Sequence, residues 1–166
     1  MGLLTVVNTD TQKIAKYIPL YGSGSKIIAV RPFLSGFSKY EQIIYVANYF
    51  SDNISIVDIT GLHEDGKMDG GQYFKGTIKL VVSIFGILFS HFKNPTSHGY
   101  YIAPRGIAFS PDGKYALVLG TETGSLIIVD SINHRQIAEI APIAKSSVGR
   151  DLNLRHIVIS NNGEIA

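Results

Sequence analysis

The chain has 166 residues, no cysteine, and only 17% charged residues. The lack of cysteine excludes disulfides, a thiol nucleophile, zinc–thiolate sites and covalent attachment of a c-type haem. The sequence also contains no Gly-x-Ser-x-Gly, His-Glu-x-x-His, P-loop or dinucleotide-binding motif. No local motif therefore indicates a catalytic class.

Charges of opposite sign nearly balance, with 15 Lys and Arg against 13 Asp and Glu, a net charge of +2. This balance gives no reason to expect a nucleic-acid partner. The start, MGLLTVVNTDTQ, lacks the basic region and long apolar run of a signal peptide. The longest apolar stretch, residues 78–92, is shorter than the roughly 20 residues needed to span a bilayer, so no transmembrane segment is predicted.

The sequence does contain an internal repeat. YVANYFSDNISIVD at Tyr45–Asp58 has the layout of LVLGTETGSLIIVD at Leu117–Asp130, 72 positions later. PRGIAFSPDG at Pro104–Gly113 matches LRHIVISNNG at Leu154–Gly163, 50 positions later. Two further matches are KIIAVRP at Lys26–Pro32 with RGIAFSP at Arg105–Pro111, and TVVNTDTQKIAKYIP near the start with IIVDSINHRQIAEIAP at Ile127–Pro142.

Each repeat predicts four short antiparallel strands. A first strand such as RGIAFS ends in a PDGK or NNGE turn, where Asp-Gly or Asn-Gly supplies the positive φ of a hairpin. Two apolar strands follow around a polar turn, and a fourth strand such as RQIAEIAPI closes the unit. The fully apolar stretches suit strands covered on both faces by stacked sheets. Asp58 and Asp130 share one repeat position, so we expect each to bond groups of its own turn.

Four-stranded units at this spacing are typical of the blades of an all-β, β-propeller fold. We count about two and three-quarter blades, whereas closed propellers have roughly 4–8. We therefore expect another protein chain, or the remainder of the same polypeptide, to complete the ring. The predicted pieces are the end of a blade (1–22), a blade (23–83), an inserted loop (84–101), a second blade (102–150) and the start of another (151–166).

YVANYFSDNISIVDI resembles the YVTN repeat, and PRGIAFSPDGKYALVLGTETGSLIIVDS resembles a more divergent copy. That repeat family builds the propellers of lactonase-like proteins, bacterial surface proteins and several periplasmic redox enzymes. The resemblance implies a propeller and an extracytoplasmic location, periplasmic or secreted. It does not imply a particular function, because one fold hosts many activities.

A basic residue recurs where the first strand of each repeat begins: Lys26, Arg105 and Arg155, the last followed by His156. First strands line the channel of a propeller, so these residues are our candidates for binding an anionic ligand at one mouth of it. Arginine suits this role because its guanidinium offers a planar pair of donors. The alternative is that a wet rim simply favours long polar side chains.

The inserted region carries the remaining candidates. Its apolar segment IFGILFSHF predicts a protein interface, because exposed apolar patches mark docking sites. The alternatives are that it folds back onto its own blade or that it contacts a membrane surface. The predicted interface residues are Ile84, Phe85, Ile87, Leu88, Phe89 and Phe92. The two histidines His91 and His98 lack a third ligand, and the acidic stretch around Glu64, Asp65 and Asp69 lacks a calcium-loop pattern. We therefore predict no metal and no cofactor.

These features favour a non-catalytic propeller scaffold or protein-interaction module, a segment or subunit of a larger assembly. The resemblance keeps an alternative open, in which the propeller belongs to a lactonase-like hydrolase or a cofactor-bearing periplasmic oxidoreductase. In that case Arg105, Arg155 and His156 would hold an anionic group over the channel.

Overall fold

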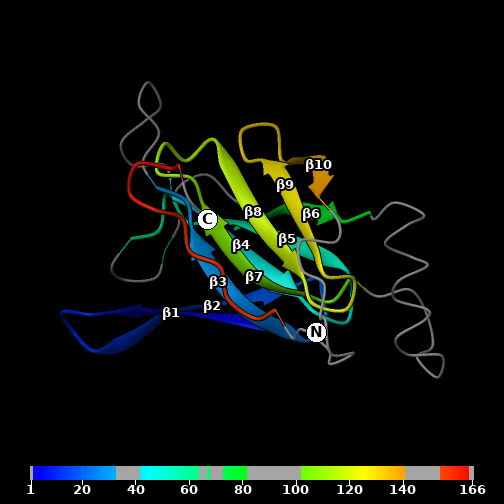
Figure 1. The fold of residues 1–166 in the computed structure, drawn as a ribbon. Coiled ribbons are helices and arrows are strands. Elements are labelled where there is room, and N and C mark those ends of the chain that lie inside the picture. The colour runs from blue at the N-terminus through cyan, green and yellow to red at the C-terminus, as the bar shows by residue number, and fades with distance from the viewer. Residues whose placement is uncertain are drawn as a thin grey trace.

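The computed structural model describes residues 2–32, 42–63, 67, 73–81, 102–140 and 154–164. Within these residues the chain forms ten strands and no helix, arranged in three antiparallel sheets (Figure 1). The all-β propeller prediction is confirmed. The strands are β1 (Gly2–Asn8), β2 (Lys13–Leu20), β3 (Ser25–Val30), β4 (Ile43–Asn48), β5 (Asn53–Asp58), β6 (Phe74–Lys79), β7 (Pro104–Phe109), β8 (Tyr115–Gly120), β9 (Ser125–Asp130) and β10 (Arg135–Ile140).

Each complete sheet is a simple meander in which consecutive strands pair. The order is β3-β4-β5-β6 in one sheet and β7-β8-β9-β10 in the other, while β1 and β2 form a separate hairpin. These are the two predicted four-stranded blades, preceded by the last two strands of another. The first strands of the two blades, β3 and β7, lie against each other.

The turns explain why the repeat is visible in the sequence. Asp130 Oδ1 accepts hydrogen bonds from the backbone N–H groups of Ile132 and Asn133, and Asn8 Oδ1 accepts the equivalent pair in the β1–β2 hairpin. Asp58 Oδ1 accepts the N–H of Thr60. The prediction that Asp58 and Asp130 bond their own turns is therefore confirmed. Such side chains favour turns because they mimic a backbone acceptor.

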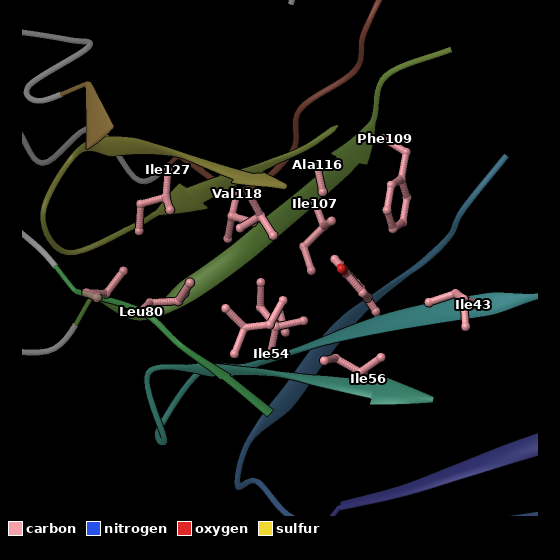
Figure 2. Packing of buried hydrophobic residues seen from close by; sticks show 14 residues of the cluster. Ile43, Ile54, Ile56, Leu80, Ile107, Phe109, Ala116, Val118 and Ile127 are labelled. Atoms are coloured by element: carbon pink, nitrogen blue, oxygen red, sulfur yellow. The ribbon is translucent and has the colours of Figure 1, made fainter. Parts of the chain in front are cut away.

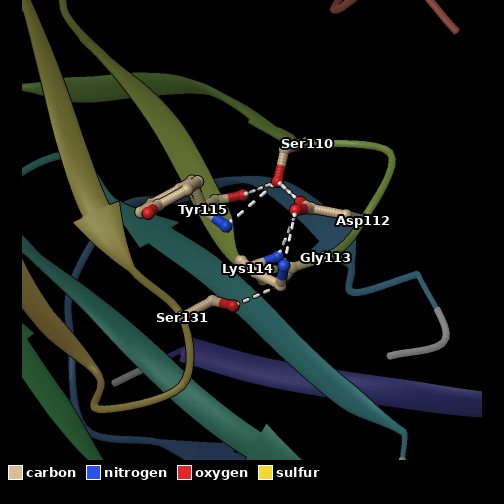
Figure 3. Close-up of polar contacts among 6 residues, drawn as sticks. All are labelled: Ser110, Asp112, Gly113, Lys114, Tyr115 and Ser131. Atoms are coloured by element: carbon tan, nitrogen blue, oxygen red, sulfur yellow. Dashed lines mark hydrogen bonds and ion pairs between the residues drawn. The ribbon is translucent and has the colours of Figure 1, made fainter. Parts of the chain in front are cut away.

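The PDG and NNG turns close with the same hydrogen bonds. In the first, Ser110 Oγ donates to Asp112 Oδ1 at 2.6 Å and Gly113 N donates to the Ser110 carbonyl at 2.8 Å (Figure 3). Ser160, Asn162 and Gly163 form the equivalent pair of bonds 50 residues later. Gly113 and Gly163 have φ values of 69° and 76°, a region that glycine enters without steric cost.

A large hydrophobic core lies between the two blades (Figure 2). Ile54 and Ile56 of β5 face Val118 of β8 and Ile127 of β9, and all four are at most 4% exposed. Full burial of a side chain of this size stabilises the fold by roughly 1.5–3 kcal/mol. The rest of this core comes from Ile43, Tyr45, Ala47, Ile78, Leu80, Ile102, Ile107, Phe109, Ala116 and Val129.

A second core attaches the β1–β2 hairpin to the other face of the β3–β6 blade. Leu4, Ile18 and Leu20 pack there against Ile44, Val46 and Val57. The opposite face of the hairpin is apolar but open, since large side chains on it are more than half exposed. These are Leu3 (59%), Val7 (51%), Ile14 (52%) and Tyr17 (53%), and we call them the end face.

The sequence predicts that residues near Leu154–Ser160 are the first strand of a further blade. In the structure these residues lie beside β7 and form no strand ladder with the described part of the chain, so their role as a first strand stays a prediction. Thr121 Oγ1 donates to the Leu154 carbonyl at 2.7 Å, and the Arg155 carbonyl lies close to Gly106. A strand is defined by its hydrogen-bonded neighbour. The segment therefore has the position of a first strand without the pairing.

Candidate functional site

Two of the predicted ligand-binding cations come together at the start of the first strands. Lys26, on β3, places Nζ 5.8 Å from the centroid of the Tyr49 ring, and Arg105, on β7, places Cζ at the same distance from that ring. Tyr49 directly follows β4, so one aromatic ring connects cations of both blades. Cations at this distance are attracted by the ring, by about 0.5–1 kcal/mol at exposed sites.

The tyrosine is itself fixed by the second blade. Its hydroxyl donates to Glu122 Oε1 at 2.8 Å, across 73 positions of sequence. Partial burial raises the pKa of Tyr49, and the hydrogen bond to Glu122 and the charge of that carboxylate raise it further. Tyr49 is therefore a neutral hydrogen-bond donor at physiological pH, and its ring is held in place at the rim.

Next to Tyr49, the ring of Phe50 is exposed to solvent. It is 62% exposed, it meets the Tyr49 ring edge-on with centroids 5.0 Å apart, and Lys26 Nζ lies 5.9 Å from its centroid. Gly24 makes room for it, because a Cβ there would lie 2.5 Å from Phe50 Cδ2. Gly24 also has a φ of 67°, which disfavours any side chain at this position.

The turn that carries both rings is anchored from below by Asn48, which is fully buried. Its Nδ2 donates to Asn53 Oδ1 at 2.7 Å and to Ser55 Oγ at 2.9 Å, and its Oδ1 accepts from Ser25 Oγ at 2.8 Å. One amide thus links β3, β4 and β5 at the rim. Buried polar groups satisfied in this way rigidify a structure.

Asp52, in the same turn, joins the two blades by a backbone contact. Its Oδ1 accepts the N–H of Ala103 at 2.9 Å. Burial raises the pKa of Asp52, although the hydrogen bonds from the backbone of Ala103 and Ile102 oppose that rise. Both acidic groups at this rim are therefore engaged in bonds across the blade interface.

The structure places the other predicted site residues less closely. Arg155 and His156 are exposed on the segment beside β7. The interface residues Ile84, Phe85, Ile87, Leu88, Phe89 and Phe92 lie outside the described residues, as do His91, His98 and the acidic residues Glu64, Asp65 and Asp69. Within the described part of the chain, no cluster of three potential metal ligands exists.

The opposite rim is closed by a different set of contacts between the blades. The buried Arg31 donates through Nη1 to the Ser131 carbonyl at 2.9 Å, and the Tyr45 hydroxyl lies 2.7 Å from His134 Nδ1. Burial raises the pKa of Tyr45, against the charge of Arg31 and with that of Asp130. On the outer edge, the Gln136 amide pairs with both backbone groups of Val81. This side of the interface is occupied by structural bonds.

Sequence reasoning found the cations of the site but missed Tyr49, Phe50 and Glu122. The available signal was the difference between the two matching turns, YFSDN and TETG. A turn that contains two adjacent aromatic residues breaks the polar pattern of a hairpin connection.

Comparisons with known proteins identify the fold to which these sheets belong. No family model and no curated protein matches the sequence. Hydrazine synthase from Kuenenia stuttgartiensis is similar in structure, with 22% identity, a TM-score of 0.54 and 98% of this chain covered. A putative 6-phosphogluconolactonase from Bacteroides uniformis has 17% identity, a TM-score of 0.51 and 98% of this chain covered. The β-propeller domain of Cps50 (Swd1) from Myceliophteria thermophila has 14% identity, a TM-score of 0.50 and 87% coverage.

These likenesses establish the class: the chain has the fold of a partial β-propeller. It spans only 34% of the hydrazine synthase chain, 40% of the lactonase chain and 36% of the Cps50 chain. The similar structures carry the names of two enzymes and of one propeller domain. At such low sequence identity they give information on the fold alone. The described residues contain no helix that is both apolar and long enough for a membrane span.

Proposed function

We propose that this chain is part of a non-catalytic β-propeller scaffold or protein-interaction module. In this proposal, the ring is completed by further blades from the same polypeptide or from another chain. The short span relative to similar structures supports this, since they are between two and three times as long.

The observation that carries the proposal is the open end face of the β1–β2 hairpin. Leu3, Val7, Ile14 and Tyr17 form an apolar face, although the other face of the same hairpin is packed on the next blade. Contiguous exposed apolar surface marks an interaction site. The surface that fits it best is the apolar face of another blade, because blade-on-blade packing is how both observed cores are built.

Several finer features belong to the same proposal. They are the YVTN-like character of the repeat, the extracytoplasmic location, and the division into pieces at 1–22, 23–83, 84–101, 102–150 and 151–166. We also retain the docking role of the apolar residues between Ile84 and Phe92, so that deleting this segment abolishes a stable complex while the blades stay folded.

Hydroxyl-radical footprinting of the protein from its natural source tests ring completion. We expect Leu3 and Tyr17 to be oxidised much more slowly there than in the 1–166 chain expressed alone. Ile132, which is 38% exposed in the β9–β10 turn, serves as the internal reference. Equal oxidation of the end face in both samples would contradict the proposal.

The non-catalytic part is tested on the same native material. We expect no visible absorption band, no bound metal and no lactone hydrolysis. Turnover of a lactone, or a cofactor band, would overturn this part of the proposal. Replacing Arg105 and Arg155 by alanine would then show whether the rim cations contribute to the reaction.

A further inference from the structure

We propose that Lys26, Tyr49, Phe50 and Arg105, here called the Tyr49 platform, form a docking surface for an acidic segment of another protein. This inference rests on the role of the chain as an interaction module. It does not depend on ring completion, and the two are measured separately.

An exposed aromatic ring provides the anchor of this surface. Phe50 is 62% exposed although the repeat does not require an apolar residue at this turn. In the matching turn of the second blade, Thr121 and Thr123 are 7% and 5% exposed and polar. Aromatic residues and arginine dominate the binding energy of protein interfaces, so the platform has the composition of an energetic centre.

The platform is ordered before any partner binds. Phe50 packs edge-on against Tyr49, Tyr49 is hydrogen-bonded to Glu122, and Asn48 fixes the start of the turn. The ring of Phe50 also fills the space above Gly24. Binding to a surface that is already ordered avoids much of the entropic cost of association.

The charges around the anchor select an acidic partner. Lys26 Nζ lies within 6 Å of both ring centroids and is exposed, and Arg105 Cζ lies 5.8 Å from the centroid of the Tyr49 ring. The exposed Arg155 adds a further cation on the segment beside β7.

The neighbouring acids do not reverse this preference. A hydrogen bond does not remove the charge of a carboxylate, but Glu122 and Asp52 are half-buried and accept from Tyr49 and Ala103 within the protein. Lys26 is exposed, so it is the charged group of this surface that a partner contacts. A segment that combines carboxylates with an apolar side chain matches the platform best. Its carboxylates would pair with Lys26 while the apolar group covers Phe50.

Fluorescence anisotropy with labelled peptides tests the proposal on the 1–166 chain. The probes are an octapeptide of alternating glutamate and phenylalanine and its counterpart with lysine in place of glutamate. We expect the acidic peptide to bind, the basic one to bind much more weakly, and added salt to weaken the acidic complex.

Substitutions assign the binding to the platform. We expect Phe50→Ala to weaken the acidic peptide by about tenfold or more, and Lys26→Gln by about fivefold. The matched control is Ile132→Ala, which removes an exposed apolar side chain at the opposite rim and should leave binding unchanged. Circular dichroism of each variant confirms that the fold is retained.

Three results would overturn the proposal. One is equal binding of the acidic and basic peptides. Another is unchanged affinity in the folded Phe50→Ala variant. A third is displacement of the peptide by single-stranded DNA at lower concentration than by poly-glutamate, which would identify a nucleic-acid surface instead.

Discussion

The two complete blades carry the same repeat but differ in how they are covered. In the β3–β6 blade, the four central residues of β5 are all buried, because the hairpin lies on one face and the next blade on the other. In the β7–β10 blade, burial along β9 alternates between buried and intermediate residues. The repeated sequence therefore determines where strands and turns form. The position of a blade between its neighbours determines how much each buried side chain contributes to stability.

The largest effect of this difference is expected for Ile56 and Ile128, which occupy matching positions 72 residues apart. Ile56 faces the core between the blades and is 4% exposed, whereas Ile128 is half-buried on the far face. We expect Ile56→Ala to lower the free energy of unfolding by roughly 2–5 kcal/mol and Ile128→Ala by about 1 kcal/mol. Urea denaturation of both variants measures this.

The same pair sharpens the proposed assembly. If another blade covers the far face of the β7–β10 blade in the native protein, the cost of Ile128→Ala should rise there toward that of Ile56→Ala. Equal costs in the 1–166 chain would show that the position in the stack does not control the energetics.

A medium effect is expected from the polar centres at the rim, where the blades differ again. Asn48 bonds three side chains in the first blade, while Gly120 takes its place in the second and Thr123 bonds Ser125. We expect Asn48→Ala to cost about 1–3 kcal/mol, since it leaves buried partners unpaired. Thr123→Ala, the control, should cost about 1 kcal/mol.

Thermal or urea unfolding of these two variants provides the measurement. A larger loss for Thr123→Ala than for Asn48→Ala would contradict the view that one amide organises the rim of the first blade.

The smallest effect concerns pH, and the two regions should respond with opposite sign. Hydrogen bonds from the Asn133 side chain and from the backbone of Asn133 and Ile132 lower the pKa of Asp130, so its stabilisation is present above the ordinary aspartate pKa and is lost on acidification. Burial raises the pKa of Asp52. The folded state then keeps a proton on Asp52 above pH 3.8, and stability falls as the pH rises through that window.

Replacing each aspartate by asparagine separates the two contributions. We expect Asp130→Asn to make stability less dependent on pH between about pH 2 and 5, and Asp52→Asn to make it more dependent. Unfolding measured across this range distinguishes the two, and identical slopes for both variants would refute the assignment.

Much of the fold could be predicted from the sequence because its determinants are local. Strand alternation, the Asp-Gly and Asn-Gly turns and the repeated Asp58 and Asp130 positions all act within a few residues. Lys26 and Arg105 could also be identified from the sequence, since both stand at the same position of the repeat. Tyr49 and Glu122 were not, because their hydrogen bond joins residues 73 positions apart and depends on how the blades stack.

The segment that begins at Leu154 shows again that local sequence predicts turns better than contacts between distant residues. Its turn is written in the sequence and forms as expected, with Ser160, Asn162 and Gly163 in place. Its strand pairing could not be predicted in the same way. A strand ladder needs a neighbouring strand, and the residues next to Leu154 in the sequence do not determine which strand pairs with it.

The local hydrogen bonds of the repeated turns have a consequence for how such a chain could change over generations. The turns at Ser110–Lys114 and Ser160–Glu164 each contain hydrogen bonds between their own five residues. A duplicated stretch of DNA that encodes a blade would therefore also encode the residues that form its turn. Gene duplication could thus lengthen or shorten the ring by whole blades without redesigning a turn. New binding surfaces would then arise by substitution in a single copy, as the aromatic pair beside β4 illustrates.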